Sequence, residues 1–86
     1  MTIDWEKLNE GLNKLTGYDL EACERDERAV NNNYPDLTFS KSFQIRLAAR
    51  ALEVRPDELK NLPLKDYNRV CQMVFGFLFG TAGAAT

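Results

Sequence analysis

The sequence predicts an all-α protein, a small single-domain bundle of four to five helices. Apolar residues recur three and four positions apart in successive segments, and Thr, Ser and Pro stand where helices would begin. With 86 residues, 44% of them hydrophobic, the chain can build one core but not two. We expect residues 1–80 to form this domain and residues 81–86, which lack a bulky side chain, to be a flexible tail.

The first segment has apolar residues near helical spacing from Ile3 to Leu15, with charged residues between them. This pattern predicts an amphipathic helix interrupted by Gly11, because glycine costs about 1 kcal/mol relative to alanine in a helix interior. An irregular or extended start is the alternative that the sequence leaves open.

Thr16 and Asp19 predict the start of a second helix. The Thr16 hydroxyl is placed to accept a hydrogen bond from the backbone amide near Asp19, whose carboxylate favours the positive end of the helix. The interior side is predicted to consist of Leu20, Cys23 and Val30. The charged residues are expected to face mostly outward: Glu21, Glu24, Arg25, Asp26, Glu27 and Arg28. Residues 31–36, rich in Asn and containing Pro, predict a loop.

Three further helices are predicted in the second half of the chain. Ser40 precedes a wide apolar stripe over 41–52, which indicates a central helix. Proline suits the first turn of a short helix over 56–61, and another proline opens the last helix, 63–79, which Gly80 ends. The last helix carries five apolar residues at spacings of three and four: Leu64, Tyr67, Cys71, Val74 and Leu78.

Composition argues against an enzyme or a metalloprotein. The chain has no histidine, so it lacks an imidazole base and a histidine metal ligand. Cys23 and Cys71 are too few for a four-ligand zinc site, and we expect reduced thiols, with Cys71 a small buried hydrophobe. The acids at 21, 24, 26 and 27 alternate with arginines, as on a solvated helix face. We therefore expect no catalytic, cofactor-binding or metal-binding residues.

Net charge −2 and a pI near 5.0 disfavour a protein that neutralises phosphates, so we expect no nucleic-acid partner. Residues 45–60 superficially resemble a helix-turn-helix, and a small DNA-binding regulator is the alternative function; an unrelated structural adaptor is a third. The candidate recognition helix, however, opens with Pro56, Asp57 and Glu58. No apolar run approaches the roughly 20 residues that span a bilayer, so we expect a soluble, cytoplasmic protein without a membrane partner.

The segment 74–79 is apolar on nearly all sides of a helix, because Phe75, Phe77 and Phe79 accompany Val74 and Leu78. One interpretation folds these phenylalanines back onto the first helix. The other makes them a contact surface that another copy or a partner covers. On the second interpretation, the protein-interaction residues are predicted to be Tyr67, Val74, Phe75, Phe77, Leu78 and Phe79.

Four pieces of the sequence together resemble the small tail assembly chaperones of tailed bacteriophages and prophages. They are LTGYDLEA from Leu15, LAARALEV from Leu47, LKNLPLKDY from Leu59 and FLFG from Phe77. The likeness covers roughly residues 15 to 80. Two departures are Glu53, where such proteins often have Gly at the turn, and a short, divergent segment before Leu15.

This resemblance implies a non-catalytic helper in tail assembly, in the cytoplasm of a host bacterium. Such a protein forms homo-oligomers, coats the tape measure protein and is displaced as tail tube protein subunits polymerise. It is absent from the finished virion, and in many relatives a ribosomal frameshift yields a longer version. No residue of the predicted contact surface is taken from the family; all six come from the periodicity argument.

Overall fold

The computed structural model describes residues 2–30 and 35–80, and its regular elements are all helical. In chain order they are α1 (Trp5–Lys14), α2 (Gly17–Val30), the 3-10 helix η1 (Leu37–Phe39), α3 (Lys41–Leu52), α4 (Pro56–Lys60) and α5 (Leu64–Leu78). The all-α prediction is confirmed, with each α-helix close to its expected place, whereas η1 was not anticipated. The predicted tail, 81–86, lies outside the described residues, as does most of the predicted loop.

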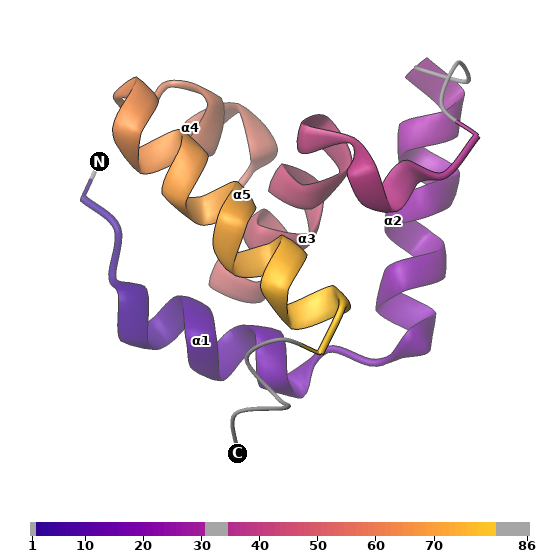
Figure 1. Cartoon of the computed structure of the whole chain (residues 1–86), viewed down its shortest axis with the longest axis horizontal. Helices are drawn as coiled ribbons and strands as arrows, with labels where there is room; N and C mark the ends of the chain where they lie inside the picture. Colours follow the sequence, from indigo (N-terminus) through magenta and orange to yellow (C-terminus); the bar gives the residue numbers. More distant parts are fainter. Residues whose placement is uncertain (1, 31–34, 81–86) are drawn as a thin grey trace.

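The wide apolar stripe predicted a central helix, and this prediction is confirmed. Helices α1, α2, α4 and α5 and the 3-10 helix all pack against α3, which lies behind α5 in Figure 1. Eight of the twelve residues of α3 are buried, so nearly its whole circumference is covered. They are Phe43, Gln44, Ile45, Leu47, Ala48, Ala49, Ala51 and Leu52.

Of the two alternatives for the start of the chain, the helix is present: α1 begins at Trp5, and the side chain of Asp4 caps it. The Asp4 carboxylate accepts a hydrogen bond from the Lys7 backbone N–H at 3.0 Å. Ile3, just before the cap, and Leu8, one turn inside, are both buried in the same core, the arrangement of a hydrophobic staple. The helix is therefore anchored from its first turn, and the chain before it is extended.

Gly11 lies in close contact with the backbone of α3. A Cβ added at this position would lie 2.2 Å from the carbonyl oxygen of Ala51 and 2.8 Å from its carbonyl carbon. These distances are shorter than van der Waals contact, and both atoms belong to backbone. The glycine that the sequence marks as an interruption of the helix is therefore what allows the two helices to pack together, and α1 continues through it.

In the cap of α2, Thr16 is the hydrogen-bond donor and the Asp19 side chain the acceptor, whereas the sequence predicted that the Thr16 hydroxyl accepts. The Thr16 backbone N–H donates to Asp19 Oδ2 at 2.8 Å, and the Thr16 hydroxyl donates to the same oxygen at 3.3 Å. Asp19 Oδ1 accepts a 2.6 Å bond from Arg50 Nε of α3. The Thr16 N–H first, and the Arg50 guanidinium next, hold the pKa of Asp19 below its ordinary value. One carboxylate thus caps α2 and joins it to α3.

Two residues of the predicted interior stripes are exposed instead. Val30, at the last position of α2, and Leu64, at the first position of α5, lie at helix ends where no other helix covers them in the described structure. Leu59 of α4 and Leu62, in the turn between α4 and α5, are buried.

The turn from α3 to α4 places Glu53 in the left-handed region, at φ 60°. The Glu53 N–H donates to the Arg50 carbonyl at 3.3 Å, and the Val54 N–H donates to the Ala49 carbonyl at 2.9 Å. These two bonds form a Schellman motif. Glycine is the residue that such a motif prefers at the left-handed position, which Glu53 occupies here. After α5, Gly80 adopts a φ of 73°, so the predicted glycine stands at a position that requires the left-handed region.

Candidate protein-binding surface

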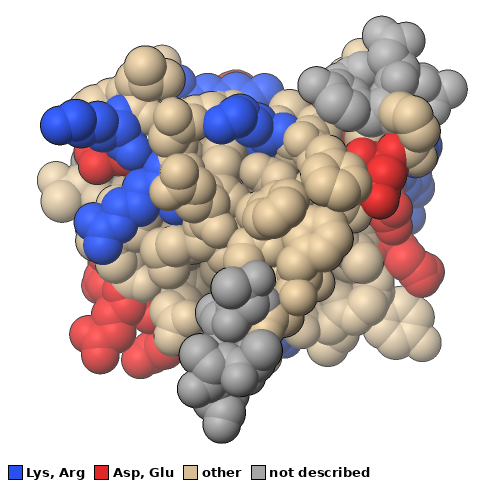
Figure 2. All heavy atoms as spheres, in the orientation of Figure 1, with Lys and Arg blue, Asp and Glu red and all other residues tan. Residues whose placement is uncertain are grey.

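The C-terminal half of α5 carries no charged side chain. Its charged residues, Lys65, Asp66 and Arg69, all lie in the first half, and residues 70–80 contain none. Figure 2 shows the result: an uncharged surface spreads over the centre and right of this face, with Lys and Arg gathered at the upper left. Asp and Glu lie at the lower left and along the right edge.

Three phenylalanines form an exposed cluster beside this part of α5. The ring centroids of Phe75 and Phe79, one helical turn apart, are 4.5 Å from each other. Phe39 of η1 lies 5.9 Å from Phe75 and 5.5 Å from Phe79. Their exposed fractions are 55% for Phe39, 38% for Phe75 and 49% for Phe79. We call these three residues the aromatic patch; it stabilises itself by tilted ring contacts while leaving large apolar area in solvent.

Phe39 was not among the predicted contact residues. Its place is set by η1, because the Asp36 carboxylate accepts the Thr38 N–H at 2.9 Å and the Ser40 N–H donates to the Leu37 carbonyl at 2.8 Å. This short capped turn buries Leu37 and presents Phe39 to α5. The sequence signal that could have indicated this turn is Asp36 two residues before Thr38, because an Asp side chain often accepts a hydrogen bond from the backbone N–H two residues on.

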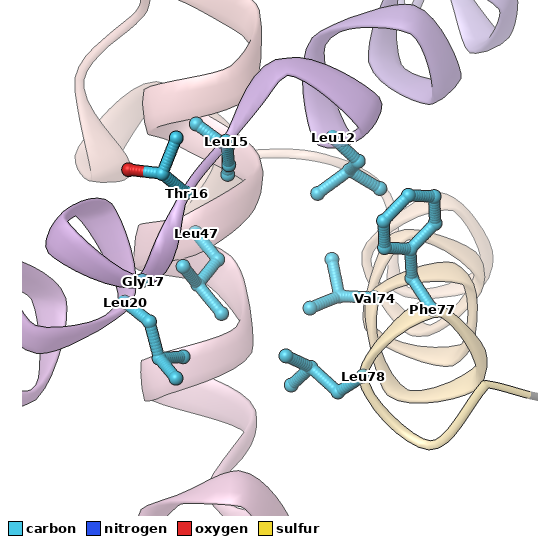
Figure 3. A pocket seen from close by; sticks show the side chains of 9 residues that line it. All are labelled: Leu12, Leu15, Thr16, Gly17, Leu20, Leu47, Val74, Phe77 and Leu78. Atoms are coloured by element: carbon cyan, nitrogen blue, oxygen red, sulfur yellow. The ribbon is translucent and has the colours of Figure 1, made fainter.

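Phe77 and Leu78 face a second apolar feature, which we call the apolar pocket. It has a volume of about 190 Å³ and opens between the junction of α1 and α2, the middle of α3 and the end of α5. In Figure 3, the side chains of Leu12, Leu20, Leu47, Val74, Phe77 and Leu78 converge on it. Leu15, Thr16 and Gly17 also line it, and among the described residues of its wall Thr16 supplies the only polar side chain.

The structure separates the six predicted contact residues into three groups. Phe75 and Phe79 belong to the aromatic patch, while Phe77 and Leu78 are half-buried at the apolar pocket. Val74 belongs to the same group as Phe77 and Leu78, because it lines the pocket too, but it is fully buried and lies behind the surface.

Tyr67 forms the third group. It precedes Phe75 by eight residues, about 12 Å along the helix, in a separate open hollow with Leu64 and Lys60. Burial, the main cause, raises the pKa of its hydroxyl. The structure therefore does not bring Tyr67 together with the other predicted residues.

Glu27 is an exception among the charged residues of α2, which were predicted to face mostly outward. Its side chain is 1% exposed and accepts hydrogen bonds from Arg46 Nε at 2.7 Å and Ser42 Oγ at 3.1 Å. A buried carboxylate is tolerated when charged and polar donors surround it, so this group ties α2 to α3. Among the described residues, no group of acidic, cysteine or histidine side chains is arranged to hold a metal ion.

The segment that superficially resembles a helix-turn-helix has an acidic second helix. Helix α4 spans five residues, and the Arg55 N–H donates to Glu58 Oε2 at 2.8 Å, which caps its first turn. Asp57 and Glu58 thus occupy the end that would meet DNA.

The two thiols are buried, and burial, the largest cause, raises the pKa of Cys23 and of Cys71. Within the described chain, no helix has the length and hydropathy that a bilayer crossing requires.

The fold and this surface together define a small all-α protein with an exposed aromatic patch beside an apolar pocket. A family model described as phage tail assembly chaperone proteins, E, or 41 or 14, matches residues 11–78. The chain therefore belongs to this family of phage tail assembly chaperones. The match begins four residues before the resemblance identified in the sequence and ends two residues earlier. No curated protein and no solved structure matches the chain.

Proposed function

We propose that this protein is a non-catalytic chaperone that self-associates and binds the tape measure protein during tail assembly, in the cytoplasm of the host bacterium. Membership of the family supports a role in tail assembly. The observation that carries the proposal is the aromatic patch, because three partly exposed phenylalanines in a 9.8 kDa chain are an aggregation hazard unless another protein covers them. The tail tube protein is a further candidate partner.

The proposed contact surface is the C-terminal half of α5 with its neighbours. Phe75 and Phe79 offer flat apolar rings, and Phe77 and Leu78 form the edge of a pocket that admits a bulky side chain. A helix with an apolar stripe is the partner that such a surface fits, since helix-in-groove recognition places anchors three and four residues apart. Tyr67 stays a predicted contact at the other end of the helix, and Val74 supports the surface from below.

Co-expression with the tape measure protein tests this proposal. The tagged chain is expected to co-purify with the tape measure protein, and Phe75→Asp or Phe79→Asp is expected to weaken capture or self-association at least about 30-fold, as for a contact residue at the centre of an interface. Tyr18→Asp is the matched control, because Tyr18 is an exposed aromatic residue on α2 that lines no part of the patch or pocket. If both phenylalanine variants kept wild-type capture and self-association, the proposed contact surface would be wrong.

We also propose that nucleic acid and membranes are not partners. The net charge of −2 and the acidic first turn of α4 support this part of the proposal. A mobility assay with duplex DNA at low salt is expected to show no shift. A shift that weakens steeply as salt is raised would instead favour the DNA-binding regulator.

A further inference from the structure

The aromatic patch and the apolar pocket lie on different flanks of the same end of α5. Phe75 and Phe79 share one flank, about 40° apart around the helix axis, whereas Leu78 lies about 60° from Phe75 on the side away from Phe79, and Phe77 lies about 160° from Phe75. Phe39 extends the first flank through η1, and the α1–α2 junction extends the second. The patch of one copy therefore cannot fill the pocket of the same copy.

The pocket has the size and lining that a phenyl ring requires. Its volume is about 190 Å³, and eight of the nine described residues that line it are apolar or glycine. A buried apolar cavity of about 150 Å³ accommodates benzene in an engineered protein. Phe39 and Phe79 are the more exposed members of the patch, so either ring is available for insertion.

Charge favours contact between unlike ends of two copies. Residues 4–30, which contain α1 and α2 and thus one wall of the pocket, hold eight acidic and four basic residues, a net charge of −4. Residues 36–80, which contain the aromatic patch, hold five acidic and seven basic residues, a net charge of +2. A contact between two α1–α2 halves brings like charges together, so the net charge of −4 favours contact of this half with the other half of a second copy.

We propose that the aromatic patch of one copy docks into the apolar pocket of a second copy. This inference rests on the self-association in the proposed function and specifies its geometry. Because the two surfaces differ, the contact is heterologous, and a pair keeps one free pocket, on one copy, and one free patch, on the other. Association continues beyond two copies, into a ring or an open chain.

The area available makes each junction weak. From the exposed fractions of its three rings, the patch offers roughly 300 Å², against about 800 Å² per partner in a stable interface of standard size. Single junctions therefore form and dissociate readily, and the population of long assemblies depends on protein concentration.

Two complementary variants test the docking directly. Phe79→Asp disables the patch and leaves the pocket, whereas Leu20→Glu disables the pocket and leaves the patch. Each variant alone is expected to be monomeric by light scattering at concentrations where the wild type exceeds a dimer. In a mixture, the intact patch of the Leu20→Glu variant can dock into the intact pocket of the Phe79→Asp variant. No second junction can follow, so the expected product is a 1:1 dimer. Both changes introduce acids, so the two altered surfaces repel each other.

Several outcomes overturn the docking. It is wrong if the wild type is monomeric at all concentrations, if either variant associates like the wild type, or if the mixture of two folded variants stays monomeric. Circular dichroism verifies folding, and Phe39→Asp and Leu78→Glu replace a variant that does not fold. Capture of the tape measure protein is measured separately: capture by folded variants that never pair refutes the docking but leaves client binding standing, and failure of the wild type to capture refutes client binding alone.

Discussion

Replacing Gly11 with alanine sets two effects of opposite sign against each other. Helix propensity alone favours alanine by about 1 kcal/mol inside a helix. The structure opposes this gain, because the new Cβ would lie 2.2 Å from the Ala51 carbonyl oxygen and 3.0 Å from the Ala51 Cβ. The first of these atoms is backbone of α3, so no rotation of a side chain can relieve the contact.

Relief requires α1 to move away from α3 by about 1 Å, which loosens Leu8 and Leu12 in the core. Overpacking of this kind costs about 1–3 kcal/mol, and a backbone contact places the cost at the upper end. After subtraction of the propensity gain, we expect a net loss of about 2 kcal/mol in the free energy of unfolding. For a domain of this size the melting temperature should fall by about 8–16 °C.

The assay is thermal and urea unfolding followed by far-ultraviolet circular dichroism, at concentrations low enough to keep self-association from contributing. Gly17→Ala is the matched control, because Gly17 begins α2 and a Cβ there meets no atom within 4 Å. This control should keep or slightly raise stability, by up to about 1 kcal/mol. If Gly11→Ala were as stable as Gly17→Ala, the close approach of α1 to α3 would not depend on glycine, and the reasoning would fail.

Three further substitutions test other parts of the fold. Glu53→Gly should raise the free energy of unfolding by about 0.5–1 kcal/mol, because glycine adopts φ 60° without the cost of a Cβ; Glu53→Ala, which keeps that cost, should give no gain in the same urea titration. Glu27→Ala should lower stability by about 3 kcal/mol, since it leaves Arg46 without its 2.7 Å partner; the double variant with Arg46→Ala should lose less than the sum of the two single changes, and strict additivity would argue against the pairing. Asp19→Asn should destabilise the protein at neutral pH. Because the folded pKa of Asp19 lies below 3.8, the difference from wild type should be complete well above that value and shrink as pH falls through the folded pKa; a difference that grew in acid would contradict the assigned hydrogen bonds.

The helices were predictable because their signals are local. Ser40 accepts the Phe43 N–H at 3.3 Å, proline stands at the first position of α4, and Gly80 ends α5. Each of these features depends on residues within one turn, and the apolar stripe of α3 depends only on spacing. Local signals of this kind suffice for the number, order and approximate bounds of the helices.

Other features were missed because tertiary neighbours determine them. Glu27 has the same local surroundings as the exposed acids beside it, and only α3 supplies the Arg46 and Ser42 donors that make its burial possible. Gly11 lowers helix propensity within its own segment, and its benefit appears only where α3 approaches. Phe39 follows a segment predicted as loop, so its contact with Phe75 and Phe79, more than 30 residues away, could not be inferred from periodicity.

The arrangement of α5 separates binding from stability. Val70, Cys71 and Val74 form its buried side and hold the helix against the core, while Phe75 and Phe79 project from another side. Substituting an outward phenylalanine removes ring contacts within the aromatic patch but opens no cavity in the core. A change such as Phe79→Asp should therefore alter association much more than folding, which makes the effect of the patch on self-association and client capture measurable in a folded protein.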